Sequence, residues 1–354
     1  MQPFESCFMV TTTVMSMESC VVLCIRLILL PSPPMMDLQD TMGGQTQGPF
    51  DAIHFLKGGL AGGICCSITH GALCPVDVVK TRIQLDPVKY NRGMIGGFAQ
   101  VVQAEGVSAL ATGLGPTVVG YFVQGFFKFG GVELVKIKAA EYLGPRKAWD
   151  NRVPIYLTAA ACAEFVADVF LCPLEATRIR LVSDPNYASG LLTAIPKILR
   201  SEGVIQGFYS GFAPILFKQI PYTMAKFAVQ GYAAEQIYGV LGQTPKTMSD
   251  TGNMGVALTS GIVAGVASAI ISHPADTLLS MVNKEGAGGS GSVMSRLSNL
   301  MFATGFRKLF LVGLGPRCVM IGTLTAGQFA IYDSVMQLTG ASKFHFVNPD
   351  APAH

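Results

Sequence analysis

The sequence predicts an all-α membrane protein, in which six transmembrane helices form three tandem repeats of about 100 residues. Three observations support this prediction: an apolar composition, long stretches free of charge, and landmarks that recur along the chain. Half of the 354 residues are apolar and only 13% are charged, against roughly 25% in soluble domains. The mean hydropathy of +0.44 and the 40 glycines suit membrane helices, where small residues let backbones approach closely.

The repeat is visible in two independent sets of landmarks. In the first set a proline is followed two residues later by an acidic residue, at Pro75 and Asp77, Pro173 and Glu175, and Pro274 and Asp276. In the second set a Gly-x-x-Pro segment ends at Pro116, Pro214 and Pro316. Both sets keep a period of about 100 residues, which indicates a tandem triplicate.

Each repeat is predicted to contain two long apolar helices. No Asp, Glu, Lys or Arg lies between Lys57 and Asp77, between Glu105 and Lys128, or between Asp250 and Asp276. Each stretch therefore supplies the roughly 20 apolar residues of a membrane span. The third and fourth helices carry more charges, at Glu164, Asp168, Lys218 and Lys226. The expected spans are 52–84, 113–140, 153–183, 212–238, 254–283 and 311–338.

Shorter amphipathic stretches near 93–104, 189–201 and 293–303 are expected to lie flat on the membrane surface. The predicted organisation is an extension over 1–50, repeats over 51–145, 150–243 and 250–340, and a tail over 341–354. The extension is expected to be weakly structured, because it lacks both the arginines of a transit peptide and a long enough apolar run.

Several classes of function are disfavoured. A net charge of +3 gives no excess of positive charge for binding nucleic acid. No Walker loop, nucleotide fingerprint or zinc motif is present, so an enzyme is not expected, nor is a resident metal or cofactor. Nothing in the residues specifies an oligomeric state.

The repeated motif resembles the signature of the mitochondrial carrier family, a proline, an acidic residue and two basic residues in the order Pro-x-[Asp/Glu]-x-x-[Lys/Arg]-x-[Lys/Arg]. Repeat 1 has Lys80 and Arg82 at the basic positions, and repeat 2 has Arg178 and Arg180. The resemblance covers about residues 52–340. It implies a six-helix barrel with three-fold pseudosymmetry, a central water-filled cavity and a location in the mitochondrial inner membrane. Contact with membrane lipid, cardiolipin included, is a further expectation from the family.

The resemblance also implies a gate on the matrix side. The prolines would kink the odd helices, and the acidic residues would converge near the axis, where Lys80 and Arg178 bridge to them. Repeat 3 departs from the pattern, because Leu279 and Met281 replace both basic residues. At most two of three such pairs are therefore expected, with Lys284 as a candidate substitute. The gate residues are Pro75, Asp77, Lys80, Pro173, Glu175, Arg178, Pro274 and Asp276.

The opposite gate is expected to be weaker. On the second helix, Glu133 and Lys136 are the acidic and basic residues that such a gate needs. The fourth helix has Gly231 at the corresponding position, which cannot form an ion pair. The sixth helix has Asp333 with Met336.

Positions where the repeats differ are candidates for the cargo site, because three-fold packing does not require them to differ. Before the signature prolines stand His70, Asp168 and Ala269 in one layer, and Cys66, Glu164 and Gly265 in another. Ionisable groups at mid-membrane depth are costly, so their presence indicates a function. His70, Glu164 and Asp168 are therefore predicted to handle a proton. Positive charge and hydrogen-bond donors for an anion are expected from Lys128, Lys218, Lys226, Arg317, Gln124, Tyr222 and Gln328.

Stretches in all three repeats resemble phosphate carriers within this family. They include Thr69–His70, Ala163–Asp168, Gln219–Phe227, Ser272–Asp276, Met320–Ala326 and Ile331–Val335. The resemblance implies transport of inorganic phosphate with a proton, or in exchange for hydroxide, into the matrix.

Two alternatives stay open at this point. One is a carrier of another substrate such as copper, because Cys66 aligns with Glu164 and soft thiolates suit Cu(I). The adjacent Cys65 would point about 100° away on a helix, which weakens a shared role. The other is a receptor on the carrier fold that does not transport.

Overall fold

The computed structural model describes residues 52–86, 88–184, 187–245, 247–282, 296, 299–301, 309–311, 314–341 and 343–346. The expected N-terminal extension, the candidate Lys284 and most of the predicted stretch 293–303 lie outside these residues. The long helices are α4 (Ala52–Leu85), α6 (Leu114–Leu143), α8 (Arg152–Ser183), α10 (Phe212–Leu241), α11 (Asp250–Val282) and α14 (Leu314–Leu338). The shorter ones are α5 (Gly93–Glu105), η1 (Val107–Ala111), α7 (Pro145–Asp150) and α9 (Leu191–Tyr209).

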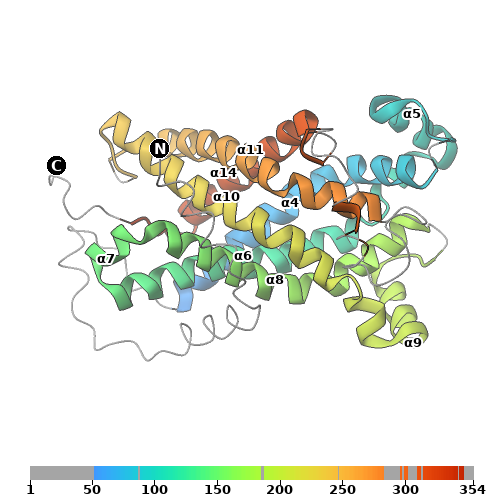
Figure 1. Ribbon diagram of the computed structural model, residues 1–354, viewed down its shortest axis with the longest axis horizontal. Helices are drawn as coiled ribbons and strands as arrows, with labels where there is room; N and C mark the ends of the chain where they lie inside the picture. Colours follow the sequence, from blue (N-terminus) through green and yellow to red (C-terminus); the bar gives the residue numbers. More distant parts are fainter. Residues whose placement is uncertain are drawn as a thin grey trace.

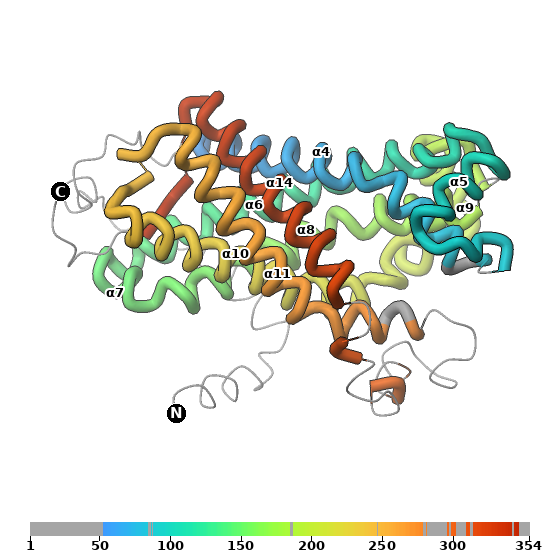
Figure 2. Tube along the Cα trace, turned by 90° about the horizontal axis from the view of Figure 1, so that it is seen from above, coloured from blue at the N-terminus to red at the C-terminus, as the bar shows by residue number. Residues whose placement is uncertain are grey.

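The six long helices form a closed ring. Each packs against its neighbour in the order α4, α6, α8, α10, α11 and α14, and α14 packs against α4. Helices α5 and α9 lie at one end of the bundle, and α7 lies at the other (Figures 1 and 2). The end with α5 and α9 is called the signature end here, because the odd helices finish there after their prolines. The end with α7 is called the tail end, because residues 343–346 lie there.

The predicted fold class is confirmed, and the six expected spans match the long helices closely. The expected stretch 93–104 corresponds to α5. The expected stretch 189–201 corresponds to the first part of α9, which continues to Tyr209 past a non-helical residue, Gly203, with φ of 77°. A positive φ there suits glycine, which has no Cβ to clash.

Within the described part of the chain, four helical segments are long and apolar enough to cross a membrane: Ala52–Ile83, Val107–Leu143, Arg152–Ser183 and Asp250–Leu278. Helices α10 and α14 complete the ring and carry more polar side chains. Large apolar side chains are exposed on the helices, among them Ile68, Val119, Phe170, Ile262 and Ile271. Exposed apolar side chains on long helices are expected where lipid is the solvent.

The signature prolines lie inside helices that continue past them, at Pro75 in α4, Pro173 in α8 and Pro274 in α11. A proline has no N–H to donate to the carbonyl group four residues earlier. In repeat 2 that carbonyl belongs to Val169, and it accepts a hydrogen bond of 3.0 Å from the hydroxyl group of Tyr209 in α9. The backbone acceptor freed by Pro173 is thus satisfied by the surface helix of its own repeat.

Glycines allow the closest approach of helices in repeat 1. A Cβ atom on Gly125 of α6 would lie 2.2 Å from the carbonyl oxygen of Gly62 in α4, and one on Gly62 would lie 2.4 Å from that of Gly125. The two backbones therefore touch directly, which is a packing mode that only small residues permit.

We expect Gly125→Ala to destabilise the protein, because the added methyl group meets backbone that cannot rotate away. Overpacking of this kind costs roughly 1–3 kcal/mol. Thermal unfolding of the detergent-solubilised protein, followed by fluorescence of the single tryptophan, Trp149, measures the shift. Gly115→Ala is the matched control, because a Cβ there meets nothing within 4 Å. Equal unfolding temperatures for the two variants would contradict the close contact.

Candidate functional site

A cluster of buried polar side chains lies inside the ring, between α6 and α8. The ammonium group of Lys128 is 2.9 Å from Oε2 of Glu164. The side-chain amide of Gln124 donates to Oε1 of Glu164 at 3.0 Å and to Oδ1 of Asp168 at 3.2 Å. The hydroxyl group of Thr223 in α10 donates to Oε2 of Glu164 at 2.9 Å. Gln124 and Lys128 lie four residues apart in α6, and Glu164 and Asp168 lie four residues apart in α8. This spacing puts the two members of each pair on one face of their helix.

The burial of this cluster is nearly complete. Glu164 and Asp168 are 0% exposed and Lys128 is 4% exposed. Oδ2 of Asp168 is buried and has no hydrogen-bond partner among the described residues. Buried polar atoms are almost always paired, so the free carboxylate oxygen marks a position where a proton or a ligand atom would be accommodated.

A second polar layer adjoins this cluster. The ammonium group of Lys226 in α10 contacts Oε1 of Gln328 in α14. The amide nitrogen of Gln328 is 3.7 Å from the sulfur of Cys66 in α4. The sulfurs of Cys65 and Cys66 lie 4.0 Å apart. The two thiols are thus closer than was expected from adjacent helix positions, whose side chains point about 100° apart. Among the described residues, no group of three or more His, Cys, Asp or Glu side chains is arranged to hold a metal ion.

The Lys226 ammonium group contacts the rings of three phenylalanines. Phe129, Phe227 and Phe329 are buried, and their ring centroids lie 5.0, 5.8 and 5.7 Å apart in pairs. The Lys226 ammonium group lies 5.1–5.6 Å from all three centroids, within the range of a cation–π contact. These aromatic residues follow directly after Lys128, Lys226 and Gln328 in the sequence. The repeat alignment therefore contained this aromatic triad, but sequence reasoning overlooked it.

His70 lies apart from the carboxylates with which the sequence grouped it. Its ring stacks on Tyr121 of α6, with centroids 3.6 Å apart and planes at 4°. No hydrogen bond joins His70 to Glu164 or Asp168 in the described structure. Tyr222 is buried in α10 beside the cluster residue Thr223. The three-membered proton set is thus divided between a carboxylate pair and a stacked imidazole.

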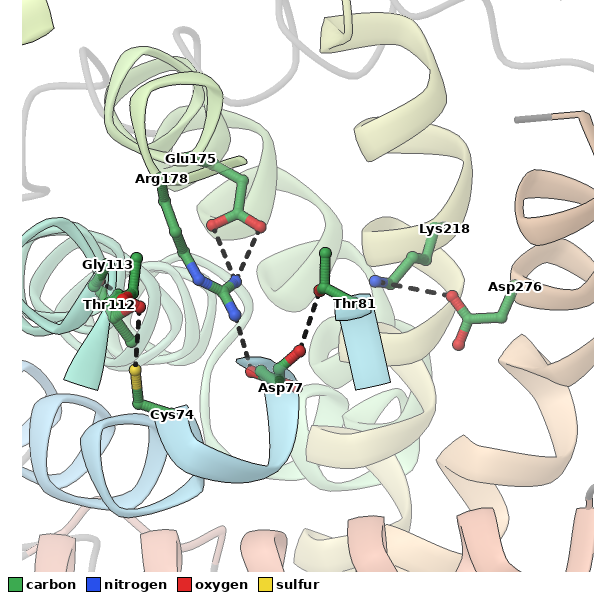
Figure 3. A network of polar contacts seen from close by, with 10 residues as sticks. Cys74, Asp77, Thr81, Thr112, Gly113, Glu175, Arg178, Lys218 and Asp276 are labelled. Carbon is green, nitrogen blue, oxygen red and sulfur yellow. Dashed lines mark hydrogen bonds and ion pairs between the residues drawn. The ribbon is translucent and has the colours of Figure 1, made fainter. Parts of the chain in front are cut away.

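Arg178 joins two acidic signature residues at the signature end (Figure 3). Its guanidinium group is 2.7 Å from Oδ2 of Asp77 in α4 and 2.9 Å from Oε1 of Glu175 in its own helix, α8. The contact with Asp77 crosses between repeats 1 and 2.

The other predicted gate contacts differ from expectation. Lys80 makes no ion pair within the described part of the chain, although it was expected to bridge to an acidic neighbour. Asp276 is instead joined to Lys218, at 3.5 Å, and to Arg317. Lys218 and Arg317 were grouped with the anion ligands, yet both lie on this signature carboxylate. Their position follows from helix direction, because the even helices begin at the end where the odd helices finish.

The last basic residue of the signature has a separate role. Arg82 donates to Glu105 of α5 at 2.9 Å, and Arg180 pairs with Glu202 of α9. Each ion pair ties the end of an odd helix to the surface helix of its repeat. In repeat 3, Met281 packs instead on an apolar cluster with Leu278, Leu300 and Leu309. The substitution thus exchanges an ionic contact for an apolar one.

The tail end contains a contact that the sequence did not predict. Glu133 and Lys136 of α6 pair at 2.8 Å and are almost fully buried. The backbone N–H of Phe344 donates to Glu133, and the Lys136 ammonium group donates to the carbonyl oxygen of Phe344 at 3.0 Å. A chain segment beyond the third repeat therefore completes the layer where the even helices lack matching charges.

Comparison with known proteins defines the family. The model of the family described as "Mitochondrial carrier protein" matches residues 51–142, 150–239 and 250–343. The chain belongs to the mitochondrial carrier family. Its members are transporters and not enzymes, and this carrier is a multi-pass protein of the mitochondrial inner membrane.

Individual relatives of this carrier cover most of its length. The chain is 50% identical to "Mitochondrial substrate carrier family protein N" of Dictyostelium discoideum, over 81% of this chain and 95% of that protein. It is 43% identical to human "Solute carrier family 25 member 3", over 79% of this chain and 75% of that protein. It is 42% identical to "Phosphate carrier protein, mitochondrial" of Caenorhabditis elegans, over 78% of each.

The Arg82–Glu105 pair is expected to make the carrier's stability depend on pH. Partial burial alone would raise the pKa of Glu105, but hydrogen bonds from Arg82 and Tyr90 and the charge of Arg82 outweigh it and lower the pKa. A lowered pKa stabilises the folded state fully above the unfolded value of about 4.3, and this contribution is lost as pH falls through the folded value. We expect Glu105→Gln to lower the unfolding temperature at pH 7, and the difference from the native chain to shrink below about pH 4.

Glu141→Gln is the matched control for this titration. Glu141 pairs with Lys138 at 2.8 Å within one helix, and exposed pairs of this kind contribute little. A difference between Glu105→Gln and the native carrier that stays constant down to pH 3 would contradict the expectation.

Proposed function

We propose that this carrier moves inorganic phosphate together with a proton, or in exchange for hydroxide, into the mitochondrial matrix by alternating access. Relatives that cover most of the chain are named phosphate carriers. The observation that carries the proposal is the buried pair of Lys128 and Glu164, with Asp168 linked to it through Gln124. Such a site offers a cation for an anion and carboxylates for a proton.

The geometry suggests how the two cargoes are coupled. While Glu164 is ionised, it holds the Lys128 ammonium group and competes with an incoming anion. A proton on Glu164 removes that negative charge and weakens the pair, so Lys128 becomes available to phosphate. A desolvated charge needs a partner. Binding of phosphate and a proton together is therefore favoured, and binding of either one alone is disfavoured.

The remaining residues have proposed roles around this pair. Lys226 with Gln328 supplies further positive charge and hydrogen-bond donors, and Gln124 and Tyr222 supply other donors. His70, stacked on Tyr121, is proposed to pass protons between the carboxylates and the signature end. Lys218 and Arg317 are proposed to meet phosphate as it passes Asp276. Lipid contact, cardiolipin included, remains a proposal from the family.

Alternating access also requires that both ends open in turn. At the signature end, the Arg178 bridge joins α4 to α8, and Asp276 joins α11 to α10 and α14. Opening this end breaks contacts between partly exposed charges, for which water substitutes. A difference of a few kcal/mol between the two states is enough for such a switch.

The first test is uptake of radiolabelled phosphate by liposomes that contain the purified carrier, with and without an inward proton gradient. We expect the gradient to stimulate uptake by the native chain. Glu164→Gln keeps the shape of the side chain but can neither ionise nor hold a proton, so the stimulation is expected to fall at least about tenfold. His70→Ala is expected to reduce it as well. Glu141→Gln, which removes the carboxylate of the partly exposed Lys138–Glu141 pair, is expected to keep the native value.

Each contrary outcome has a definite meaning. If the proton gradient stimulated phosphate uptake by Glu164→Gln as strongly as by the native carrier, the coupling role of that carboxylate would be contradicted. No phosphate uptake by folded, inserted native carrier would reject the substrate. Copper(I) uptake in the same liposomes would then test the thiols of Cys65 and Cys66, and absence of any uptake would favour the receptor alternative.

A second prediction concerns Arg178. In Arg178→Gln, Asp77 and Glu175 lose their shared cation and repel each other, so the signature end is expected to close poorly. Uptake per inserted carrier should fall at least about tenfold, while Arg178→Lys, which can neutralise one carboxylate at a time, retains an intermediate rate. Rates in Arg178→Gln equal to the native rate would show that the bridge does not gate transport.

A further inference from the structure

Residues Lys343–Phe346 return into the tail end after α14 has finished at Leu338. In Figure 2 the segment is the short dark-red piece at the left, between α7 and α10. Phe344 and Phe346 are 4% and 6% exposed. Their rings pack with each other and with Tyr156 of α8, in a cluster with Ile137 and Ala140 of α6 and Ile155 of α8. The two phenylalanines of the segment therefore belong to the buried core of the tail end, while Lys343 and His345 are half-buried.

The backbone of this segment satisfies a buried charge pair. Phe344 receives the Lys136 ammonium group on its carbonyl oxygen and donates its N–H to Glu133. Lys136 and Glu133 are 1% and 2% exposed. Charged side chains at such depth are costly unless their hydrogen bonds are made, so removal of the segment leaves both groups to be hydrated. Water entry at this layer is the physical consequence.

Lys343 connects the segment to the other two repeats. Its ammonium group is 2.7 Å from Oε1 of Gln230 in α10 and 4.9 Å from the ring centroid of Phe329 in α14. Phe329 belongs to the aromatic triad, whose rings also contact Lys226. The segment thus contacts even helices of all three repeats.

These contacts lie in the layer where α10 and α14 have no charged side chain at the positions that match Lys136 of α6. Gly231 has no side chain to pair with Lys136, and the ring of Tyr156 fills its space. Met336 of α14 is buried in the apolar core and carries no charge. Lys136 itself reaches repeat 2 through a cation–π contact of 5.4 Å with the ring of Tyr156 in α8. The hydrogen bonds that the structure describes from these α6 charges run to Phe344, and Lys343 extends the polar contacts to Gln230 of α10.

We propose that residues Lys343–Phe346 are the gate of the tail end: they hold it shut in this conformation and must withdraw once in each transport cycle. The need for withdrawal rests on the proposed alternating-access function. The closure itself rests only on the contacts described, so the two parts can be tested separately.

Closure is tested by thiol labelling, which requires no transport. Ala140→Cys places a thiol beneath the segment, and mass spectrometry follows its reaction with a hydrophilic maleimide in nanodiscs. We expect truncation after Gly340 to raise the labelling rate about tenfold or more, since buried hydrogen bonds to charges are lost. Truncation after Phe346 is the matched control, and its rate should stay within about twofold of the full chain.

A point variant guards against misfolding of the truncated chain. Lys343→Gln combined with Phe344→Ala keeps the chain length and is expected to raise the rate by a smaller factor. Cys66, which is 1% exposed in the central layer, should stay unlabelled if the barrel is intact. Equal rates for the full chain, the double variant and both truncations would overturn the proposed closure.

Withdrawal is tested by a reversible lock. Cysteines at Ala140 and Phe344 are joined by a short cleavable thiol reagent, and phosphate uptake is measured before and after cleavage. We expect the lock to stop uptake and cleavage to restore it. Undiminished uptake by the locked carrier would overturn the gate. Absence of uptake before locking, together with protected Ala140→Cys, would reject the phosphate function and leave the closure standing.

Discussion

A charge inside a membrane is tolerated only when another group compensates it, and the interior of this carrier is organised around that constraint. Lys128 and Glu164 neutralise each other, Gln124 and Thr223 also donate to Glu164, and the Lys226 ammonium group contacts three aromatic rings. Asp168 departs from this pattern within the cluster, because its second oxygen lacks a partner among the described residues. A transporter needs such an exception, because a site in which every group is satisfied has nothing to offer a ligand.

Strict symmetry and broken symmetry have separate roles in the barrel. Phe129, Phe227 and Phe329 are identical in all three repeats and pack around one another, as a closing layer with three equal helices requires. Directly before them stand two lysines and a glutamine, so the adjacent polar layer is unequal. The same helices therefore provide a symmetric aromatic layer and an asymmetric polar layer one residue apart, and the asymmetric layer is the one proposed to bind the cargo.

The fold was predictable because two landmarks repeat and the apolar stretches have the length of a membrane. The helix that carries each candidate residue was predictable for the same reason. The direction of each side chain around the axis was not, so Lys128 and Glu164 were assigned to different cargoes although they form one ion pair. Lys218 and Arg317 were assigned by charge alone, and the structure places them on Asp276. Residues 343–346 lie beyond the third repeat as the sequence bounded it, at residue 340, and neither symmetry nor hydropathy indicated their contacts.

The ends of the three odd helices make different kinds of contact with the segments that follow them. Ion pairs hold α5 and α9, at Arg82–Glu105 and Arg180–Glu202, whereas Met281 and Leu278 make an apolar contact with Leu300 and Leu309. Added salt screens the partly exposed Arg180–Glu202 pair more than the Arg82–Glu105 pair, whose guanidinium group is buried. Sulfate or phosphate salts strengthen apolar burial, and cooling weakens it. The three sectors of one barrel thus respond differently to ionic strength and temperature, and the third would loosen first in the cold.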